Sequence, residues 1–239
     1  MSSLSTLPHT TLLPLDVTSS DSLAAAVASV SAETGGTLDY LVNNSGQQVV
    51  APILDADLGE ARAMYDVNVF GVVATVQAFA PLLLAAKGTV VNICSITGLL
   101  YPPYMGLYGS TKSALTTISE ALRLELHPLG IKVATIITGA VRTNLAANSP
   151  PHILPPNSVY TPAAKEIAAR ATGADVTDRV GSKEDFGRDL VSKVLRGATG
   201  RVYVGNLSTA VRIASSWFPA CLIDYMQAAN TGLDRLSPA

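Results

Sequence analysis

The sequence is poor in charge, cysteine and histidine, and each shortage excludes a class of protein. Charged residues make up 14% of the 239 residues and the formal net charge is −2, so general nucleic-acid binding is not expected. Two cysteines, Cys94 and Cys221, make no disulfide framework, and Cys94 is predicted to pack as a small apolar group inside a strand. The histidines His9, His127 and His152 lack metal-ligand spacing, so no metal site is predicted.

The N-terminus lacks the basic start and apolar core of a signal peptide, and no internal repeat or low-complexity tract is found. Apolar residues make up 48% of the chain, which is ample for a hydrophobic core, and the length fits one α/β domain. We therefore predict a single domain over residues 1–239 and a cytoplasmic protein.

Short apolar runs alternate with helical patterns, which predicts parallel βαβ units in a doubly wound, Rossmann-type sheet. The predicted strands are residues 10–15, 38–44, 89–95, 131–137 and 201–204. A first helix is predicted from Ser19 or Ser20 to Gly35, a second over 58–87 with a bend or break at Pro81, and a third over 104–127. Two more helices are predicted to begin after N-caps at Thr161 and Ser182. The last helix carries an apolar stripe predicted to lie in the core: Phe186, Leu190, Val191, Val194 and Leu195.

Tyr108 and Lys112 are four residues apart, so on one helix they would lie one turn apart on the same face. A phenol normally ionises near pH ~10, and a neighbouring cation favours the phenolate and lowers its pKa. Such a phenol can act as a general acid or base nearer neutral pH, as a carbonyl-to-alcohol conversion requires. Ser95 ends a buried apolar run, which places its hydroxyl at the edge of the sheet where open α/β folds bind ligands. Tyr-x-x-x-Lys by itself is also common on ordinary helix surfaces.

Asn68, Ser95, Tyr108 and Lys112 follow one another at intervals of 27, 13 and 4 residues. This pattern resembles the short-chain dehydrogenase/reductase family, whose tetrad is Asn, Ser, Tyr and Lys in that order. The resemblance implies hydride transfer between a nicotinamide cofactor and a ketone or secondary alcohol. It implies that Tyr108 donates the proton and that Ser95 bonds the carbonyl oxygen. Lys112 would bind the nicotinamide ribose and lower the pKa of Tyr108, while Asn68 would bend its helix and hold a proton-relaying water.

The resemblance also implies which residues contact the cofactor, expected to be NADP(H) with NAD left open. Asp16 and the backbone of Val17 would meet the adenine. The backbone of the turn formed by Asn43, Asn44, Ser45 and Gly46 would approach the ribose. Val141 and Thr143 would hold the nicotinamide carboxamide, next to a Thr138 that replaces the family's usual proline.

The family begins with a strand, a Gly-rich turn of the T-G-x-x-x-G-x-G kind, a helix and a second strand and helix, and this sequence does not contain them. That turn is where a dinucleotide pyrophosphate is held. We expect an N-terminally truncated gene model or splice form of a longer enzyme, which leaves cofactor binding open. The strand at 38–44 would then have an open edge unless residues 10–15 move in beside it.

The C-terminal third points to the substrate. Residues 144–181 are expected to form a lid over the substrate, and the first part of this lid is rich in Pro, Ser and Asn. Residues 207–239 are expected to form a tail on the substrate side. Four segments resemble fungal NADPH-dependent 1-acyldihydroxyacetone-phosphate reductases: 43–47, 67–71, 137–141 and 217–219. The uncharged stretch Ile213–Ile223 is too short to span a bilayer, which needs ~20 residues. It fits either a membrane interface or a helix beside the pocket, and Arg142 or Arg212 is a candidate for a phosphate or else a solvated charge.

Three functions stay open on the sequence alone. The first is an NADP(H)-dependent reductase of an acylated ketone in lipid metabolism, with peripheral contact to endoplasmic reticulum or lipid droplet. The second applies the same chemistry to another ketone, such as a steroid, retinoid or polyketide. The third is an inactive form that only pairs with full-length subunits through helices 58–87 and 104–127, the same helices expected in a homo-oligomer.

Overall fold

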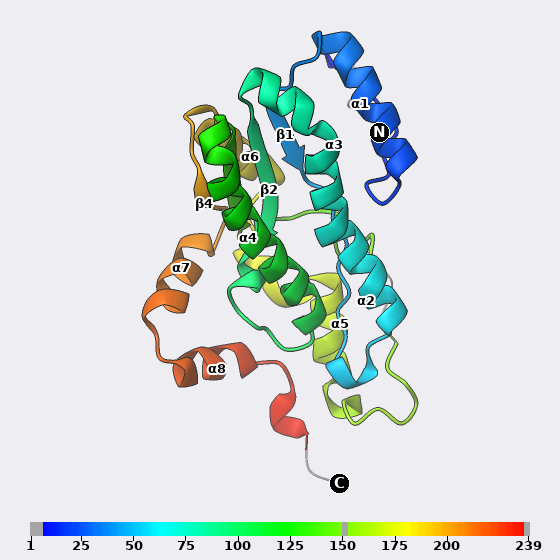
Figure 1. Cartoon of the computed structure of the whole chain (residues 1–239). Helices are drawn as coiled ribbons and strands as arrows, with labels where there is room; N and C mark the ends of the chain where they lie inside the picture. Colours follow the sequence, from blue (N-terminus) through cyan, green and yellow to red (C-terminus); the bar gives the residue numbers. More distant parts are fainter. Residues whose placement is uncertain (1–6, 150–152, 237–239) are drawn as a thin grey trace.

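A computed structural model describes residues 7–149 and 153–236; parts of the predicted lid (150–152) and tail (237–239) lie outside the described residues. One parallel sheet runs through the molecule in the order β1-β2-β3-β4 (Figure 1). Its strands are β1 (Tyr40–Asn43), β2 (Thr89–Ser95), β3 (Lys132–Thr138) and β4 (Gly200–Val204). The register pairs Ser95 with Thr138 and Thr138 with Val204, so three neighbouring strands end at one edge of the sheet.

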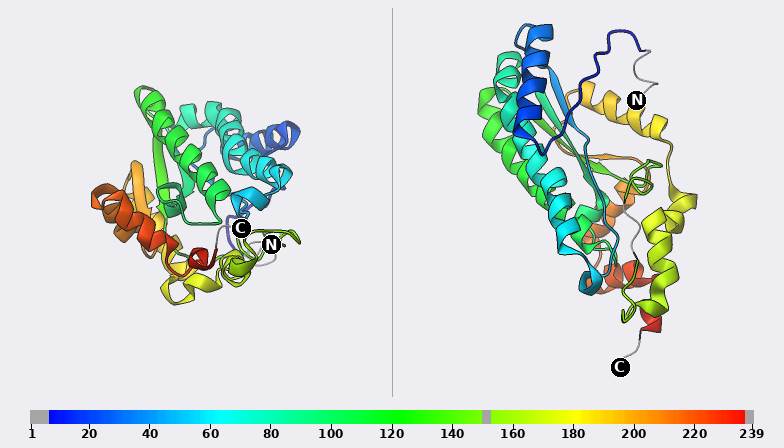
Figure 2. Two further views of the ribbon diagram at one scale, coloured as in Figure 1. Left: turned by 90° about the horizontal axis from the view of Figure 1, so that it is seen from below. Right: turned by 90° about the vertical axis from the view of Figure 1, so that its right-hand side faces the viewer.

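Helices cover both faces of the sheet, which confirms the doubly wound α/β fold. The helices are α1 (Ser20–Thr34), α2 (Leu58–Tyr65), α3 (Gly71–Ala86), α4 (Gly106–Leu126), α5 (Ala164–Thr172), α6 (Lys183–Leu195), α7 (Ser208–Trp217) and α8 (Ala220–Ala228). Figure 2 shows α1, α3 and α4 on one side of the sheet and α6 on the other. Parallel strands covered in this way are buried on both faces, and the five central residues of β3 are all buried.

The strand predicted at residues 10–15 is wrong: this segment is irregular, and Leu12, Leu13 and Leu15 are exposed. A strand needs a neighbour to complete its hydrogen bonds, and within the described residues β1 pairs only with β2. The outer edge of the sheet is therefore open, as expected, with Tyr40 and Val42 respectively 43% and 51% exposed.

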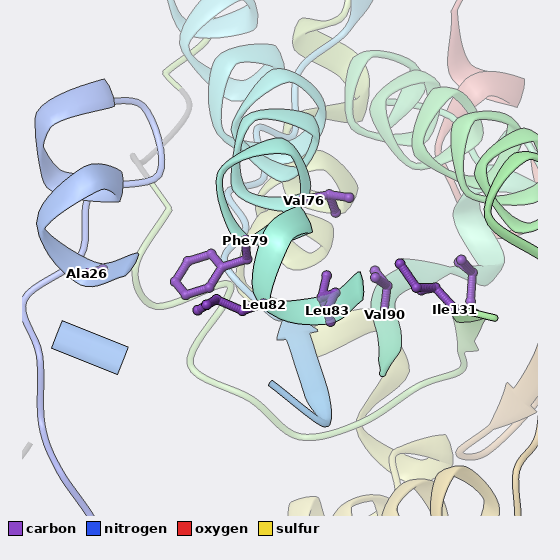
Figure 3. Packing of buried hydrophobic residues seen from close by; sticks show 8 residues of the cluster. Ala26, Val76, Phe79, Leu82, Leu83, Val90 and Ile131 are labelled. Atoms are coloured by element: carbon purple, nitrogen blue, oxygen red, sulfur yellow. The ribbon is translucent and has the colours of Figure 1, made fainter. Parts of the chain in front are cut away.

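The long helix predicted over 58–87 is interrupted, but not at Pro81. A π-helical turn, Asp66–Phe70, joins α2 to α3, and α3 continues through Pro81 to Ala86. By length and composition the run 58–86 would suffice to cross a membrane, and 44% of its most apolar window is buried inside the protein. Figure 3 shows the reason for that burial: Leu83 meets Val90, and Phe79 points toward Ala26 on α1. We read the run as the core helix of the domain.

Two of the three helix N-caps predicted from the sequence are confirmed. The Ser19 hydroxyl accepts from the Ser22 N–H, and Gly35 ends α1 in a left-handed conformation. Ser182 caps α6 in the same way, accepting from the Asp185 N–H at 3.0 Å. Thr161, predicted as an N-cap, instead donates to the Ser158 carbonyl within a 3-10 turn that precedes α5.

The apolar stripe of α6 is only partly in the core. Leu190 and Val194 are buried against β3 and β4, and Phe186 packs beside them. Val191 and Leu195 were predicted in the core and are exposed. The α6 helix touches the sheet at its edge strand, so a narrower stripe is enough to cover it.

Candidate active site

Asn68 is fully buried in the π-helical turn and ties it to the turn after β1. Its side-chain carbonyl accepts from the Gln47 N–H at 2.8 Å, and its amide donates to the Gln47 carbonyl at 2.8 Å. The same amide donates to the Thr111 hydroxyl at 3.0 Å, one residue before Lys112. A wider turn lets one side chain satisfy all three partners, which explains why the helix deviates here rather than at Pro81.

Ser95 ends β2 with its hydroxyl already oriented. Its oxygen accepts from the Thr97 N–H at 3.2 Å and from the Thr97 hydroxyl at 2.9 Å. Because these two donors occupy the lone pairs of the Ser95 oxygen, the hydroxyl proton of Ser95 points toward Tyr108 or a substrate oxygen. Thr97 is not among the residues predicted from the sequence, although Ser-x-Thr after a buried strand is typical of a serine-capped turn.

The α4 helix brings Tyr108 and Lys112 to this edge of the sheet, as their spacing predicted. Both side chains are buried, and the Lys112 ammonium lies 5.9 Å from the centre of the Tyr108 ring. The ammonium donates to the Ile93 carbonyl at 2.9 Å, two residues before Ser95. All four residues of the predicted tetrad therefore converge where β2, the π-helical turn and α4 meet.

The electrostatics of Tyr108 differ from the sequence-based expectation. Burial raises the pKa of Tyr108 to about 12, and a hydrogen bond with Ser95 lowers it by less. Burial also lowers the pKa of Lys112. The ammonium faces the ring and bonds a backbone carbonyl, so desolvation of the phenolate outweighs it. At neutral pH the phenol keeps its proton, which suits a proton donor in ketone reduction.

The raised pKa of Tyr108 predicts how ketone reduction depends on pH. A phenol with a raised pKa stays protonated as pH increases, so kcat/KM for ketone reduction is expected not to fall between pH 7 and pH 9. The measurement is a kcat/KM profile with a ketone that has no titratable group. A loss of activity with a midpoint below pH 9 would show that the ammonium lowers the pKa more than burial raises it.

The predicted cofactor residues near β1 surround the same centre. A Cβ placed on Gly46 would lie 3.5 Å from the Asn68 side-chain oxygen and 3.7 Å from the Lys112 nitrogen, so glycine leaves the ammonium approachable. The Asn43 amide donates to the Asn92 side chain at 2.8 Å, so that side chain is structural. The expected cofactor contact involves its backbone, which this hydrogen bond leaves free. Ser45 is exposed next to Gly46.

Asp16 and Val17 lie before α1. The Asp16 carboxylate accepts from the Thr18 N–H at 2.9 Å and the Thr18 hydroxyl at 2.7 Å, bonds that lower its pKa. Val17 packs against Gly71, where a Cβ would be 2.8 Å from a Val17 methyl carbon. An exposed carboxylate anchored beside the π-helical turn is compatible with the adenine contact expected of it.

A cavity of about 630 Å³ opens at this edge of the sheet. Ser95 and Tyr108 lie in its wall together with Val141 and Thr143, the residues predicted to hold a nicotinamide. This grouping, with Gly46 above the Lys112 ammonium, fits the nicotinamide-ribose end of a dinucleotide. Much of the remaining wall is apolar and comes from the predicted lid and tail: Leu145, Ala146, Val176, Val180, Leu207, Ala210, Val211, Ala214, Ile223 and Met226.

Two polar residues in the wall carried no signal in the sequence. Gln48 is buried and borders the cavity near Ser95. Arg170 also borders it, but its guanidinium is engaged, 2.8 Å from the Asp175 carboxylate and 3.2 Å from the Pro103 carbonyl. Gln48 follows the predicted cofactor turn 43–46 by two residues, whereas Arg170 comes from a segment distant in sequence that only the fold brings to the cavity.

The comparisons with known proteins agree with this geometry. The family model described as short chain dehydrogenase matches residues 3–153. The short-chain dehydrogenase ptmH of Penicillium ochrochloron is 39% identical, over 98% of this chain and 85% of its own length. The NADPH-dependent 1-acyldihydroxyacetone phosphate reductase of Schizosaccharomyces pombe is 37% identical, over 65% of this chain and 54% of its own.

Among solved structures, a short-chain dehydrogenase from Burkholderia cenocepacia in complex with NADP superposes with a TM-score of 0.68. The match covers 92% of this chain and 79% of the other, at 23% identity, which supports the fold alone.

Proposed function

The chain belongs to the short-chain dehydrogenase/reductase family of oxidoreductases, and we propose that it reduces an amphiphilic ketone with NADPH, with a 1-acyldihydroxyacetone phosphate as the substrate to test first. The observation that carries this proposal is the cavity, which joins the Ser95–Tyr108 pair to a long apolar wall and to two arginines, Arg142 and the Arg170 that is paired with Asp175.

The roles of the residues follow from their geometry. The nicotinamide cofactor supplies the hydride when bound. Ser95, with its lone pairs occupied by Thr97, donates a hydrogen bond to the carbonyl oxygen of the substrate. Tyr108, protonated at neutral pH, transfers its proton to the same oxygen as the alcohol forms. Lys112 and Asn68 hold the ribose side of the site and the helix that carries the phenol.

Arg142 is the better of the two arginines considered for a phosphate. Arg142 borders the cavity and forms no ion pair with the side chains that the structure describes, which are those of residues 7–149, 153–176 and 180–236. Arg212 does not border it, and its guanidinium stacks over Tyr203 at 5.4 Å from the ring centre. Arg170 is already neutralised by Asp175. A ligand with an anionic head at Arg142 and an acyl chain along the apolar wall satisfies both ends of the cavity.

The similarity to the fission yeast reductase supports the same substrate class and NADPH. The NADP-bound fold neighbour is compatible with that cofactor. The direct test is NADPH oxidation by this chain in the presence of an acylated dihydroxyacetone phosphate, with NADPH affinity measured separately by calorimetry. Micromolar NADPH binding would exclude the inactive form that only pairs with full-length subunits, while its absence would favour that form.

Replacing Arg142 with Gln is expected to raise KM for an acylated ketone phosphate about tenfold or more, because a charged hydrogen-bond partner of the phosphate is lost. The kcat should change little, and KM for an uncharged ketone should stay the same. Arg188→Gln is the matched control, since Arg188 is an exposed arginine on α6 paired with Asp185. Equal effects on charged and uncharged ketones would place the phosphate elsewhere.

A second candidate is reduction of a neutral, bulky ketone such as a steroid, retinoid or polyketide. The observation that favours it is the exposure of Arg142, which leaves the interior of the cavity largely apolar. A panel of such ketones, compared with the acylated phosphate at equal NADPH, decides between the two by kcat/KM.

For the assembled protein we propose a homo-oligomer in the cytoplasm, with peripheral contact to endoplasmic reticulum or lipid droplet. The support for an oligomer is a set of exposed apolar side chains along α2, the π-helical turn and α4, namely Leu58, Phe70 and Leu124. Nothing in the composition favours nucleic acid as a partner.

A further inference from the structure

Gln48 is a buried polar residue of the cavity wall whose side chain has no partner. Its exposed fraction is 7%, and it borders the cavity together with Ser95 and Tyr108. Its amide makes no hydrogen bond with residues 7–149, 153–176 and 180–236, the part of the chain whose side chains the structure describes. A buried amide left unpaired destabilises a protein, so its presence here calls for a ligand that satisfies it.

The amide of Gln48 is open to the cavity rather than sealed in the core. Among the described residues, the fully enclosed side-chain atoms without a hydrogen-bond partner belong to Thr138 and Glu166. The two polar atoms of Gln48 are therefore not fully enclosed, and the open space that Gln48 borders is the cavity. A molecule in the cavity can reach them.

The backbone on both sides of Gln48 is held in place. Both the N–H and the carbonyl of Gln47 bond the Asn68 side chain at 2.8 Å. Three residues after Gln48, the Ala51 N–H donates to the Tyr104 carbonyl at 2.8 Å. The amide therefore projects from a fixed stretch of chain, which is the condition for selecting a ligand by a hydrogen bond.

This stretch also lies beside the reacting phenol. Val49 belongs to the same buried cluster as Tyr108, and a Cβ on Gly46 would lie 3.7 Å from the Lys112 nitrogen. Gln48 stands between these two positions in the chain. The part of a substrate that its amide meets is thus the part next to the reacting carbonyl.

Several other polar groups of the wall are already engaged. The Thr97 hydroxyl donates to Ser95, and the Arg170 guanidinium pairs with Asp175. The amide of Gln48 is different, because it keeps both its N–H donors and its acceptor oxygen available.

We propose that Gln48 is a specificity residue, whose amide donates a hydrogen bond to an oxygen attached to the carbon next to the ketone carbon. The preferred substrates are then α-oxygenated ketones, a narrower class than amphiphilic ketones. An acylated dihydroxyacetone phosphate has such an oxygen on both neighbouring carbons, whereas a plain alkyl ketone has none. This assignment rests on the proposed function, since it concerns the substrate of the same site.

Two uncharged ketones of equal chain length test the assignment without involving Arg142. One is an acyloxyacetone, and the other is the 2-alkanone with no second oxygen. The full chain is expected to prefer the acyloxyacetone by about tenfold or more in kcat/KM, because the 2-alkanone leaves the amide unpaired. In Gln48→Met, which keeps an unbranched side chain of similar length, this ratio should fall about tenfold.

The ratio separates recognition from damage to the fold, because a misfolded variant loses both ketones alike. Gln77→Met is the matched control: Gln77 is an exposed glutamine on α3 outside the cavity, and the ratio should stay that of the parent. The assignment is overturned if the parent shows no preference, or if Gln48→Met keeps it. It is also overturned if Gln48→Met weakens NADPH binding tenfold with the ratio unchanged, since the amide would then serve the cofactor.

Calorimetry of both ketones with NADP⁺ present distinguishes this assignment from the proposed function. Turnover of both ketones with no effect of Gln48→Met means that the function stands and the assignment fails. Tighter binding of the acyloxyacetone that is lost in Gln48→Met, without turnover, means that the assignment stands and the function fails. If neither ketone binds or reacts, both fail.

Discussion

Tyr108→Phe is expected to lower kcat for ketone reduction by about 10²–10⁴-fold, the usual contribution of a positioned general acid. The variant loses only the phenol oxygen, which borders the cavity and bonds Ser95. Binding of NADPH should change by no more than a few fold, because the Lys112 ammonium that faces the ribose side keeps its bond to Ile93. Single-turnover kinetics with saturating NADPH measure the chemical step apart from binding.

Tyr65→Phe is the matched control for that experiment. The Tyr65 phenol donates to the Ser110 hydroxyl at 2.9 Å, outside the cavity. Its loss should cost about 1 kcal/mol of stability and leave kcat within a few fold. If Tyr108→Phe reduces ketones as fast as the parent, the proton comes from another group and the mechanism fails.

Gly139→Ala is expected to lower the free energy of unfolding by about 3 kcal/mol and to disable the site. A Cβ at Gly139 would fall on the Asn206 carbonyl oxygen and lie 2.8 Å from its carbon and 3.0 Å from the Gly205 oxygen. These neighbours are backbone and cannot rotate away, so β3 and the segment after β4 must separate. The chain after Gly139 carries Val141 and Thr143, whose displacement would open the nicotinamide side of the cavity.

The matched control is Gly187→Ala on α6, where a Cβ would meet nothing within 4 Å. Alanine in a helix interior is favoured over glycine by about 0.5–1 kcal/mol, so this variant should be as stable as the parent or slightly more stable. Urea denaturation of both variants, followed by circular dichroism, measures the difference. A Gly139→Ala protein as stable as the parent would mean that the two backbone segments are not closely packed.

Features that depend only on residues close together in the chain could be predicted from the sequence. Ser19 and Ser182 cap helices because a hydroxyl reaches an N–H two or three residues ahead, whatever the rest of the fold does. The buried strand ending at Ser95 and the four-residue spacing of Tyr108 and Lys112 are equally local. These features sufficed to predict the parallel sheet and to place the tetrad at its edge.

Three outcomes were settled only by tertiary contacts. Residues 10–15 have the composition of a strand, but the segment does not pair with the open edge of β1 and stays irregular. The pKa of Tyr108 depends on how completely the phenol leaves water, which the spacing to Lys112 does not encode. The uncharged stretch 213–223 received two interpretations from the sequence, a membrane interface or a helix beside the pocket, and the structure places Ala214 and Ile223 of this stretch in the cavity wall.

The sequence by itself therefore determined the family, the four strands of the sheet and the identity of the candidate catalytic side chains, because those depend on short-range spacing. The tertiary structure decided the raised pKa of Tyr108 and which of the two arginines, Arg142 or Arg212, borders the cavity. Each of these depends on desolvation or on contacts between segments far apart in the chain, and no local pattern records them.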